Sequence, residues 1–180
     1  AQSRRRWPLS ACRVDWPAES SPMSAAIQSA IGAAVGFAAL EALDTVVKPL
    51  GYGSSMCPPL GATAVLLFCL AKAPASSPFA VLGGYIVSSL VALAVVTFLP
   101  PDFWFLAKGL AVSGAIGGMA LTGTVHPPGG AYAFLFVAQK LPAQAIPPVL
   151  LGAVALIVAQ KVVQAVVAAT VGPEPKAKTK

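Results

Sequence analysis

Three long stretches of this chain carry no charged side chain, and they limit the solvent in which the chain can fold. Residues 24–40, 79–101 and 109–139 contain no Lys, Arg, Asp or Glu. About 20 apolar residues cross the hydrocarbon core of a bilayer, so each stretch can hold a membrane helix. The whole chain is 57% hydrophobic and 10% charged, whereas ordinary soluble domains carry about 25% charged residues. We therefore predict an integral membrane protein.

Most basic residues lie in the two terminal segments. The net charge of +6 could suggest nucleic acid as a partner, but seven of the twelve basic residues are Arg4, Arg5, Arg6, Arg13, Lys176, Lys178 and Lys180. This distribution is typical of flanks kept on one side of a membrane and argues against a nucleic-acid-binding face. We expect a basic, largely extra-membrane segment at 1–23, a transmembrane domain at 24–171 and a basic tail at 172–180.

Proline and glycine divide the apolar region into long and short helical pieces. Long helices are expected at about 24–47, 79–99, 104–123 and 146–171. Two further pieces, about 59–71 and 130–139, cover at most about 20 Å at 1.5 Å per residue, which is less than the roughly 30 Å core. The predicted fold class is an all-α membrane protein with four transmembrane helices and two short re-entrant half-helices. Six short crossings in an inverted repeat are the alternative, and only in the four-span arrangement does the 100–108 turn share a face with the termini.

The order long, short, long occurs twice, which predicts an internal duplication. Repeat 1 spans about 24–101 and repeat 2 about 102–171. At an offset of 69 positions, Pro58, Pro59, Gly61, Pro78 and Gly83 match Pro127, Pro128, Gly130, Pro147 and Gly152. Paired interrupted segments in corresponding halves indicate a transport site near the bilayer midplane.

The start of each half-helix predicts the chemistry of that site. A helix start has unpaired backbone N–H groups and a partial positive charge, so it attracts anions. Proline suits the first helical position, and glycine lets a ligand approach the backbone closely. The candidate substrate-binding residues are Ser54, Ser55, Pro59, Gly61, Ala62, Thr63, Thr124, His126, Pro127, Pro128, Gly129, Gly130, Ala131 and Tyr132. No metal ligand set or cofactor is expected.

Charged and ionisable residues in the apolar region allow more than one interpretation. His126, the single histidine, either satisfies a neighbouring carbonyl or serves as a donor or proton carrier, since ionisable residues at membrane depth are costly. Asp44 and Lys48 have the i,i+4 spacing of an ion pair, which leaves Glu41 as an outside candidate for proton coupling. Lys161 either attracts an anion or extends its amine to the membrane surface.

The motifs resemble those of the HPP family of integral membrane proteins. The resemblance rests on the block Gly61-Ala62-Thr63-Ala64-Val65-Leu66-Leu67-Phe68 and on His126-Pro127-Pro128-Gly129-Gly130-Ala131, and it covers roughly residues 24–170. It implies four membrane helices and, by analogy with plastid members, nitrite transport across the chloroplast envelope. The chloroplast inner envelope is therefore the expected membrane, with a thylakoid or bacterial inner membrane as alternatives. The positive-inside rule places both termini on the stromal or cytoplasmic side.

Two classes of function remain open at this point. The first is a transporter or channel for a small inorganic anion, nitrite above others. The second is a structural or assembly subunit of a larger, photosynthetic membrane complex, in which glycine-rich helix faces contact other subunits. An enzyme is not expected, because the chain has no H-E-x-x-H or G-x-S-x-G motif. Membrane lipids are expected partners, and two G-x-x-x-G faces also predict a homo-oligomer.

Overall fold

The computed structural model describes residues 22–171, and every regular element in that range is helical. The helices are α1 (Pro22–Val47), α2 (Pro58–Cys69), α3 (Pro78–Phe98), α4 (Ala107–Thr122), α5 (Pro127–Ala138) and α6 (Ile146–Val171). Short 3-10 turns join them at η2 (Lys48–Leu50), η3 (Pro74–Ser76), η4 (Pro101–Leu106) and η5 (Ala143–Ala145). The predicted basic tail at 172–180 and residues 1–21 of the predicted basic segment at 1–23 lie outside the described residues.

Four helical segments are long and apolar enough to cross a membrane, as the sequence predicts. Within the described range they are Met23–Leu50, Pro78–Phe98, Pro101–Thr122 and Ala143–Thr170. The α2 and α5 helices have 12 residues each, and at 1.5 Å per residue each is about 18 Å long. The expected four transmembrane helices and two short helices are therefore present.

Local sequence explains where the helices begin and end. Proline occupies the start of α2, α3 and α5, where its missing N–H costs no intrahelical bond. Ser77 caps α3, because its hydroxyl accepts the amide of Ala80 at 3.2 Å. Gly123 ends α4 with a φ of 68°, a left-handed conformation that glycine adopts without steric cost.

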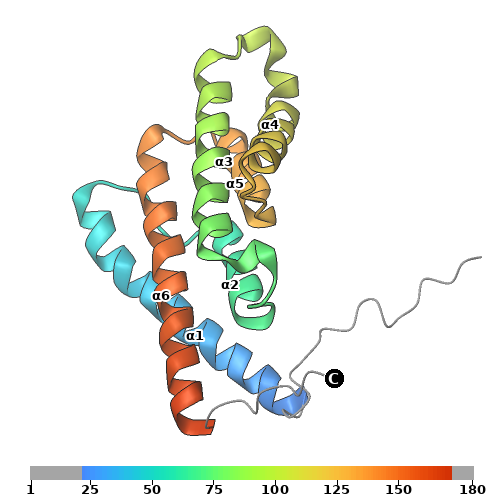
Figure 1. Cartoon of the computed structure of the whole chain (residues 1–180). Coiled ribbons are helices and arrows are strands. Elements are labelled where there is room, and N and C mark those ends of the chain that lie inside the picture. The colour runs from blue at the N-terminus through green and yellow to red at the C-terminus, as the bar shows by residue number, and fades with distance from the viewer. Residues whose placement is uncertain (1–21, 172–180) are drawn as a thin grey trace, which may run out of the picture.

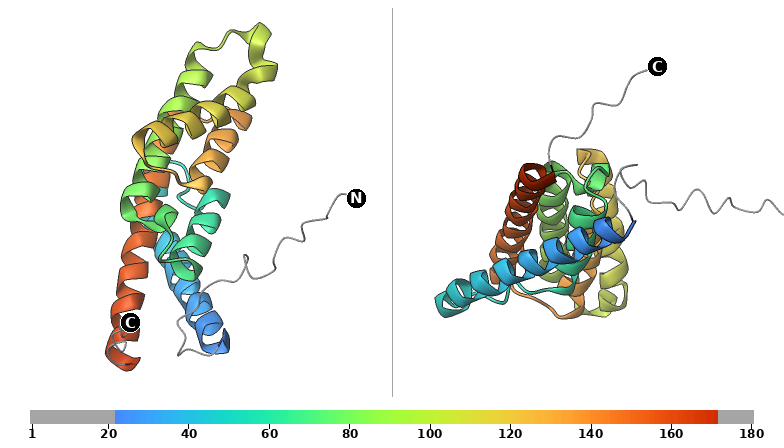
Figure 2. Two further views of the ribbon diagram at one scale, coloured as in Figure 1. Left: turned by 45° about the vertical axis from the view of Figure 1, so that its right-hand side comes forward. Right: turned by 90° about the horizontal axis from the view of Figure 1, so that it is seen from below.

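The helices pack as two groups, and each group combines two helices of one predicted repeat with the third helix of the other. Helices α1 and α2 pack against each other and against α6, whereas α4 and α5 pack against each other and against α3 (Figure 1). Two rotated views show the same grouping, with α6 beside α1 at one end of the molecule (Figure 2). The third helix of each predicted repeat therefore lies on the first two helices of the other.

The bounds of the short elements agree with the predicted duplication. The helix pair α2 and α5, and the turn pair η3 and η5, each have bounds that differ by the same 69 positions as the matching residues. A shared origin of the two halves stays a prediction, and this agreement is what it requires.

The chain direction favours the alternative with six alternating segments over re-entrant half-helices. The hydroxyl of Ser29, near the start of α1, donates to the carbonyl of Phe68, near the end of α2, at 2.9 Å. Helix α2 therefore runs back toward the end of the molecule at which α1 begins. Figure 1 shows the outer ends of α1 and α6 at the lower end and η4 at the upper end. The 100–108 turn thus lies opposite the ends of the described chain, and the predicted re-entrant course is not confirmed.

Both G-x-x-x-G faces are used inside the chain. A Cβ added to Gly32 or Gly36 would meet the ring of Phe68 from α2 at 2.5 and 3.1 Å. A Cβ on Gly114 would meet Val91 of α3 at 2.9 Å, and one on Gly118 would meet Val87 at 2.7 Å. The predicted close helix contacts are confirmed, but they form within the bundle. The homo-oligomer therefore stays a prediction that these two faces no longer support.

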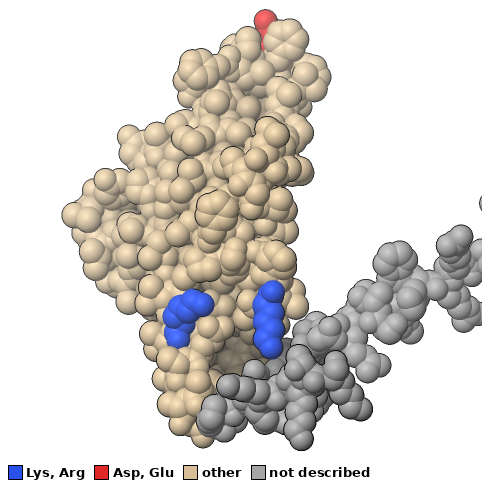
Figure 3. Space-filling view, in the orientation of Figure 1, with Lys and Arg blue, Asp and Glu red and all other residues tan. Residues whose placement is uncertain are grey.

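Charged side chains avoid the middle of one face of the molecular surface. On the face in Figure 3, basic residues lie near the lower end and an acidic residue lies at the upper tip, with an uncharged band between them. An uncharged band is what the hydrocarbon region of a bilayer requires.

The contact between α3 and the segment before α5 allows a test of this packing. A Cβ on Gly84 would meet the Cβ of His126 at 2.5 Å and the backbone oxygen of Thr124 at 3.1 Å. We expect Gly84→Ala to lower the free energy of unfolding by roughly 1–3 kcal/mol through overpacking. Gly117→Ala is the matched control, since a Cβ on this glycine of α4 meets nothing within 4 Å. Thermal unfolding in detergent measures both variants, and an equal Tm for the two would contradict this packing.

Candidate functional site

The imidazole of His126 lies at the centre of the bundle, immediately before α5. Its side chain is 0% exposed. Its Nε2 lies 2.9 Å from the hydroxyl oxygen of Thr63 in α2, and its Nδ1 lies 2.9 Å from the backbone oxygen of Ala75 in η3. This one side chain therefore joins the start of α5 to the other half-helix and to the turn before α3.

Tyr85 of α3 completes this hydrogen-bond network. Its hydroxyl lies 2.8 Å from the Thr63 hydroxyl. Its ring centroid lies 5.3 Å from that of His126 and 5.7 Å from that of Tyr132. Sequence reasoning missed Tyr85. Its signal was the spacing i, i+3, i+4 of Tyr85, Ser88 and Ser89, which places three hydroxyls on one face of an uncharged helix.

The two half-helices are joined by His126. Its ring bonds to the hydroxyl of Thr63, the sixth residue of α2. Cys57 and Thr63 occupy the positions in the first repeat that His126 and Tyr132 occupy in the second, so this bond connects the corresponding short helices of the two predicted repeats.

One buried hydroxyl in this region is poorly hydrogen-bonded. Ser89 is 1% exposed and lies beside the Tyr132 phenol, but it makes no hydrogen bond of normal geometry. A buried unsatisfied hydroxyl costs about 1–3 kcal/mol, so a ligand that accepts from it would remove this cost. We call the following six side chains the central polar seam: Cys57, Thr63, Tyr85, Ser89, His126 and Tyr132.

Comparison with protein families identifies this architecture. The family model described as "HPP, transmembrane region" matches residues 18–172. The chain belongs to the HPP family. It is an integral membrane protein with a membrane transport-type role, as this family and the apolar helices indicate. Comparison with curated proteins and with solved structures finds no match.

The HPP domain brings only some of the predicted site residues together. Thr63, His126 and Tyr132 lie in the central polar seam, and Tyr132 donates its hydroxyl to the carbonyl of Ala145 at 3.1 Å. Pro59 is buried beside them, and its carbonyl accepts from Thr63 at 3.2 Å. The seam is therefore made mainly of side chains from the two half-helices and α3.

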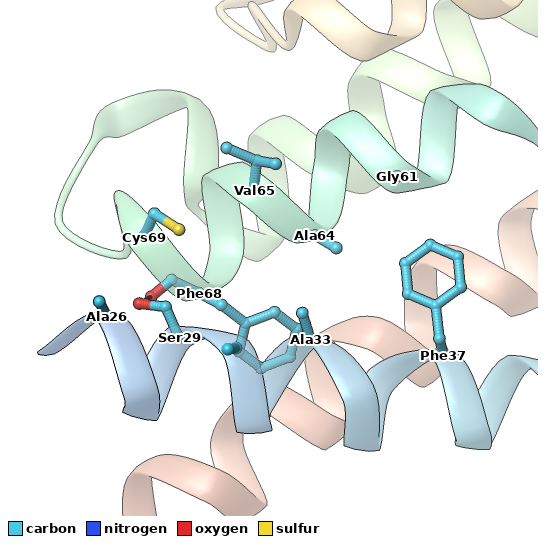
Figure 4. Close-up of a pocket in the computed structure, with 10 residues that line it drawn as sticks. Ala26, Ser29, Ala33, Phe37, Gly61, Ala64, Val65, Phe68 and Cys69 are labelled. Carbon is cyan, nitrogen blue, oxygen red and sulfur yellow. Dashed lines mark hydrogen bonds between the residues drawn. The ribbon is translucent and has the colours of Figure 1, made fainter. Parts of the chain in front are cut away.

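The predicted glycines at the half-helix starts do not face the seam. Residues two positions apart on an α-helix point about 200° apart, so Gly61 and Gly130 lie on the faces opposite Thr63 and Tyr132. Figure 4 shows Gly61 in the groove between α1 and α2, near Phe37. A Cβ on Gly130 would meet nothing within 4 Å. Leucine at either glycine would thus not fill the seam.

The remaining residues around the H-P-P motif pack against neighbouring helices or are exposed. A Cβ on Gly129 would meet the Ser88 hydroxyl at 2.8 Å, so this glycine allows α5 to approach α3. Thr124 bonds to the Thr122 hydroxyl at 2.7 Å instead of facing the seam. Ala62, Pro127 and Ala131 are exposed, and Pro128 is buried.

The double prolines limit what the helix starts can donate. Pro58, Pro59, Pro127 and Pro128 have no backbone N–H. The next amides are engaged, because Leu60 donates to the carbonyl of Cys57 at 3.0 Å and Gly129 donates to that of His126 at 2.9 Å. The helix dipole still favours negative charge at these ends. Donated hydrogen bonds must therefore come mainly from side-chain hydroxyls of the HPP domain.

Asp44 holds the segment that precedes α2, and sequence reasoning assigned it only its ion pair. The predicted bond to Lys48 is confirmed at 2.8 Å. The same carboxylate, 1% exposed, accepts the backbone amide of Ser55 at 2.6 Å and the hydroxyls of Ser54 and Ser55. Ser54 and Ser55, predicted as substrate ligands, thus serve in this structure to fix residues 51–57.

No cationic side chain of the described chain enters the seam. Lys48, Lys72, Lys108, Lys140 and Lys161 are all exposed. Lys140 lies over Trp104 at 4.8 Å and Lys108 over Phe134 at 5.6 Å, both away from the seam. Among residues 22–171, no three His, Cys, Asp or Glu side chains converge as metal ligands. The seam offers hydroxyls, a thiol and one imidazole.

The Asp44 contacts of the HPP domain predict how the 51–57 segment responds to mutation. Asp44→Ala removes the acceptor of three bonds from Ser54 and Ser55 and should ease local opening by about 2 kcal/mol. Maleimide labelling of Cys57, in a Cys12→Ser and Cys69→Ser background, should then be about 30-fold faster. Lys48→Ala is the control, since its amine is exposed and its removal leaves the three bonds from Ser54 and Ser55 to Asp44 in place. Equal labelling of Asp44→Ala and the parent would contradict this role.

Proposed function

We propose that this HPP domain transports a small inorganic anion through the central polar seam, where α2 and α5 begin. The observation that carries the proposal is the bond between His126 and Thr63, which joins the starts of two interrupted helices inside an apolar bundle. Interrupted helices at membrane depth are tolerated where they line a path or are buried in protein. A packing subunit has no need for two of them with matching ends.

Three features of the seam support an anion as the substrate. Two helix starts converge, and their dipoles favour negative charge. The hydroxyl of Ser89 is buried and makes no hydrogen bond of normal geometry, and Tyr85, one turn earlier on α3, bonds to the Thr63 hydroxyl. No described carboxylate contacts the seam, because Asp44 is held by Lys48 and Ser54 and Ser55. A cation would find a poor environment here.

Nitrite is the anion we propose, together with the chloroplast inner envelope as the membrane and the stroma as the side of both termini. The family resemblance supports nitrite, and a planar monovalent anion of a few atoms suits a site built from a few hydroxyls. The position proposed for the anion is the central polar seam, beside Thr63, His126 and Tyr132, and not the predicted glycines Gly61 and Gly130, which face away from it.

Flux into liposomes that contain the purified full chain tests this function. We expect nitrite uptake above that of empty liposomes, and we expect Tyr85→Phe to lower it about twofold to tenfold, since it removes the hydrogen bond to Thr63 in the seam, which contributes about 0.5–1.5 kcal/mol. Tyr52→Phe is the matched control, because Tyr52 is 41% exposed and lies outside the seam. Chloride, nitrate and bicarbonate, supplied in separate assays, define the selectivity.

The same assay addresses the structural-subunit alternative. If folded, inserted protein gives no flux of any of these anions above empty liposomes, transport is rejected and an assembly role remains. If Tyr85→Phe and Tyr52→Phe reduce uptake equally, the path does not run through the seam.

A further inference from the structure

The hydrogen bonds of His126 define the position of its protons. A backbone carbonyl only accepts, so Nδ1, which lies 2.9 Å from the oxygen of Ala75, carries a hydrogen. In the neutral ring Nε2 is then an acceptor, and the Thr63 hydroxyl donates to it at 2.9 Å. Tyr85 in turn donates its hydroxyl to the Thr63 oxygen at 2.8 Å. Every polar atom of this chain of bonds is satisfied.

The same atoms also satisfy a protonated ring without moving. Nε2 then donates to the Thr63 oxygen, and the Thr63 hydrogen turns to the carbonyl of Pro59, which lies 3.2 Å away. The second lone pair of that oxygen still accepts from Tyr85. A histidine with a purely structural role needs only one such arrangement. This network holds the ring in either charge state.

A protonated His126 lacks a counterion in the described protein. The phenol of Tyr85 on α3 touches the ring, and the Tyr132 phenol of α5 and the Cys57 thiol before α2 lie beyond it. From α2 and η3 the neighbours are a hydroxyl and a carbonyl. Among described carboxylates, Asp44 is paired with Lys48, and Glu41 and Asp102 are exposed.

A buried, uncompensated charge costs several kcal/mol, so the ring gains a proton readily only when a negative ligand is present. We propose that His126 binds one proton for each monovalent anion that enters the seam, which makes the HPP domain an electroneutral proton–anion symporter. This inference rests on the proposed function and assigns its coupling ion. The proton is taken by Nε2 from water on one side and released to water on the other, and it leaves with the anion.

The charge balance also sets the class of substrate. One imidazolium neutralises one monovalent anion, and no described lysine reaches the seam to neutralise a second charge. A divalent anion such as sulfate would leave a net negative charge in an apolar bundle. We therefore expect sulfate to be excluded.

The test uses the full chain in liposomes with a pH-sensitive dye inside, nitrite outside and the membrane potential clamped by potassium and valinomycin. Empty liposomes correct for nitrous acid that crosses the lipid by itself. One-to-one symport should accumulate nitrite about tenfold for each unit of inward pH gradient, with equal proton entry and no dependence on potential. Potential-driven nitrite flux without proton entry would overturn the coupling and leave transport intact, whereas no flux at all would reject the proposed function itself.

Variants locate the proton-binding group. His126→Gln keeps an amide donor but cannot titrate, so it should retain nitrite exchange and lose accumulation driven by the pH gradient. Thr63→Val removes the hydroxyl that changes from donor to acceptor when His126 is protonated, and it should weaken coupling. Thr63→Ser keeps this hydroxyl and should restore coupling. This pair keeps the test decisive if His126→Gln does not fold. Full gradient-driven accumulation in His126→Gln, or equal coupling in the two Thr63 variants, would overturn the assignment.

Discussion

The structure depends on one requirement of the bilayer, which is that every backbone polar group at membrane depth must find a partner inside the protein. At 51–57 and 123–126 the chain leaves the helical conformation, so backbone groups there need partners other than those within a helix. Each half supplies these partners differently. In the first half, the carboxylate of Asp44 accepts from Ser54 and Ser55. In the second half, Gly123 closes α4, and the amide of Thr124 donates to the carbonyl of Met119 at 2.9 Å.

This requirement explains why polar atoms meet in the middle of the bundle. An interruption brings a helix start to membrane depth. The side chain of the residue before that start is then available for contacts with other helices. Because α3 packs on α5 and α6 packs on α2, His126 before α5 reaches the Thr63 hydroxyl of α2, and Tyr85 of α3 bonds to the same hydroxyl. The central polar seam is therefore a consequence of the exchanged third helices and not of either repeat alone.

Much of the fold was predictable from local signals. Uncharged stretches predict the long helices, and the double prolines at Pro58 and Pro127 predict the starts of the short ones, since proline fixes φ and lacks an N–H. Of the central polar seam, Thr63, His126 and Tyr132 were predicted because they lie next to those starts. Tyr85 and Ser89 were missed, although their spacing with Ser88 places three hydroxyls on one face of α3. Gly61 and Gly130 lie outside the seam, because sequence position near a helix start does not say which face is inside.

The sequence by itself determined the solvent, the helical class, the position of each interruption and the ion pair of Asp44 with Lys48, because each depends on composition or on neighbours within one helical turn. Only the tertiary structure decided that α3 and α6 exchange partners, that Asp44 also holds Ser54 and Ser55, and that His126 bonds to Thr63. The side-chain bonds among these contacts join residues 10 to 63 positions apart. Their geometry follows from how the helices pack, which no local pattern encodes.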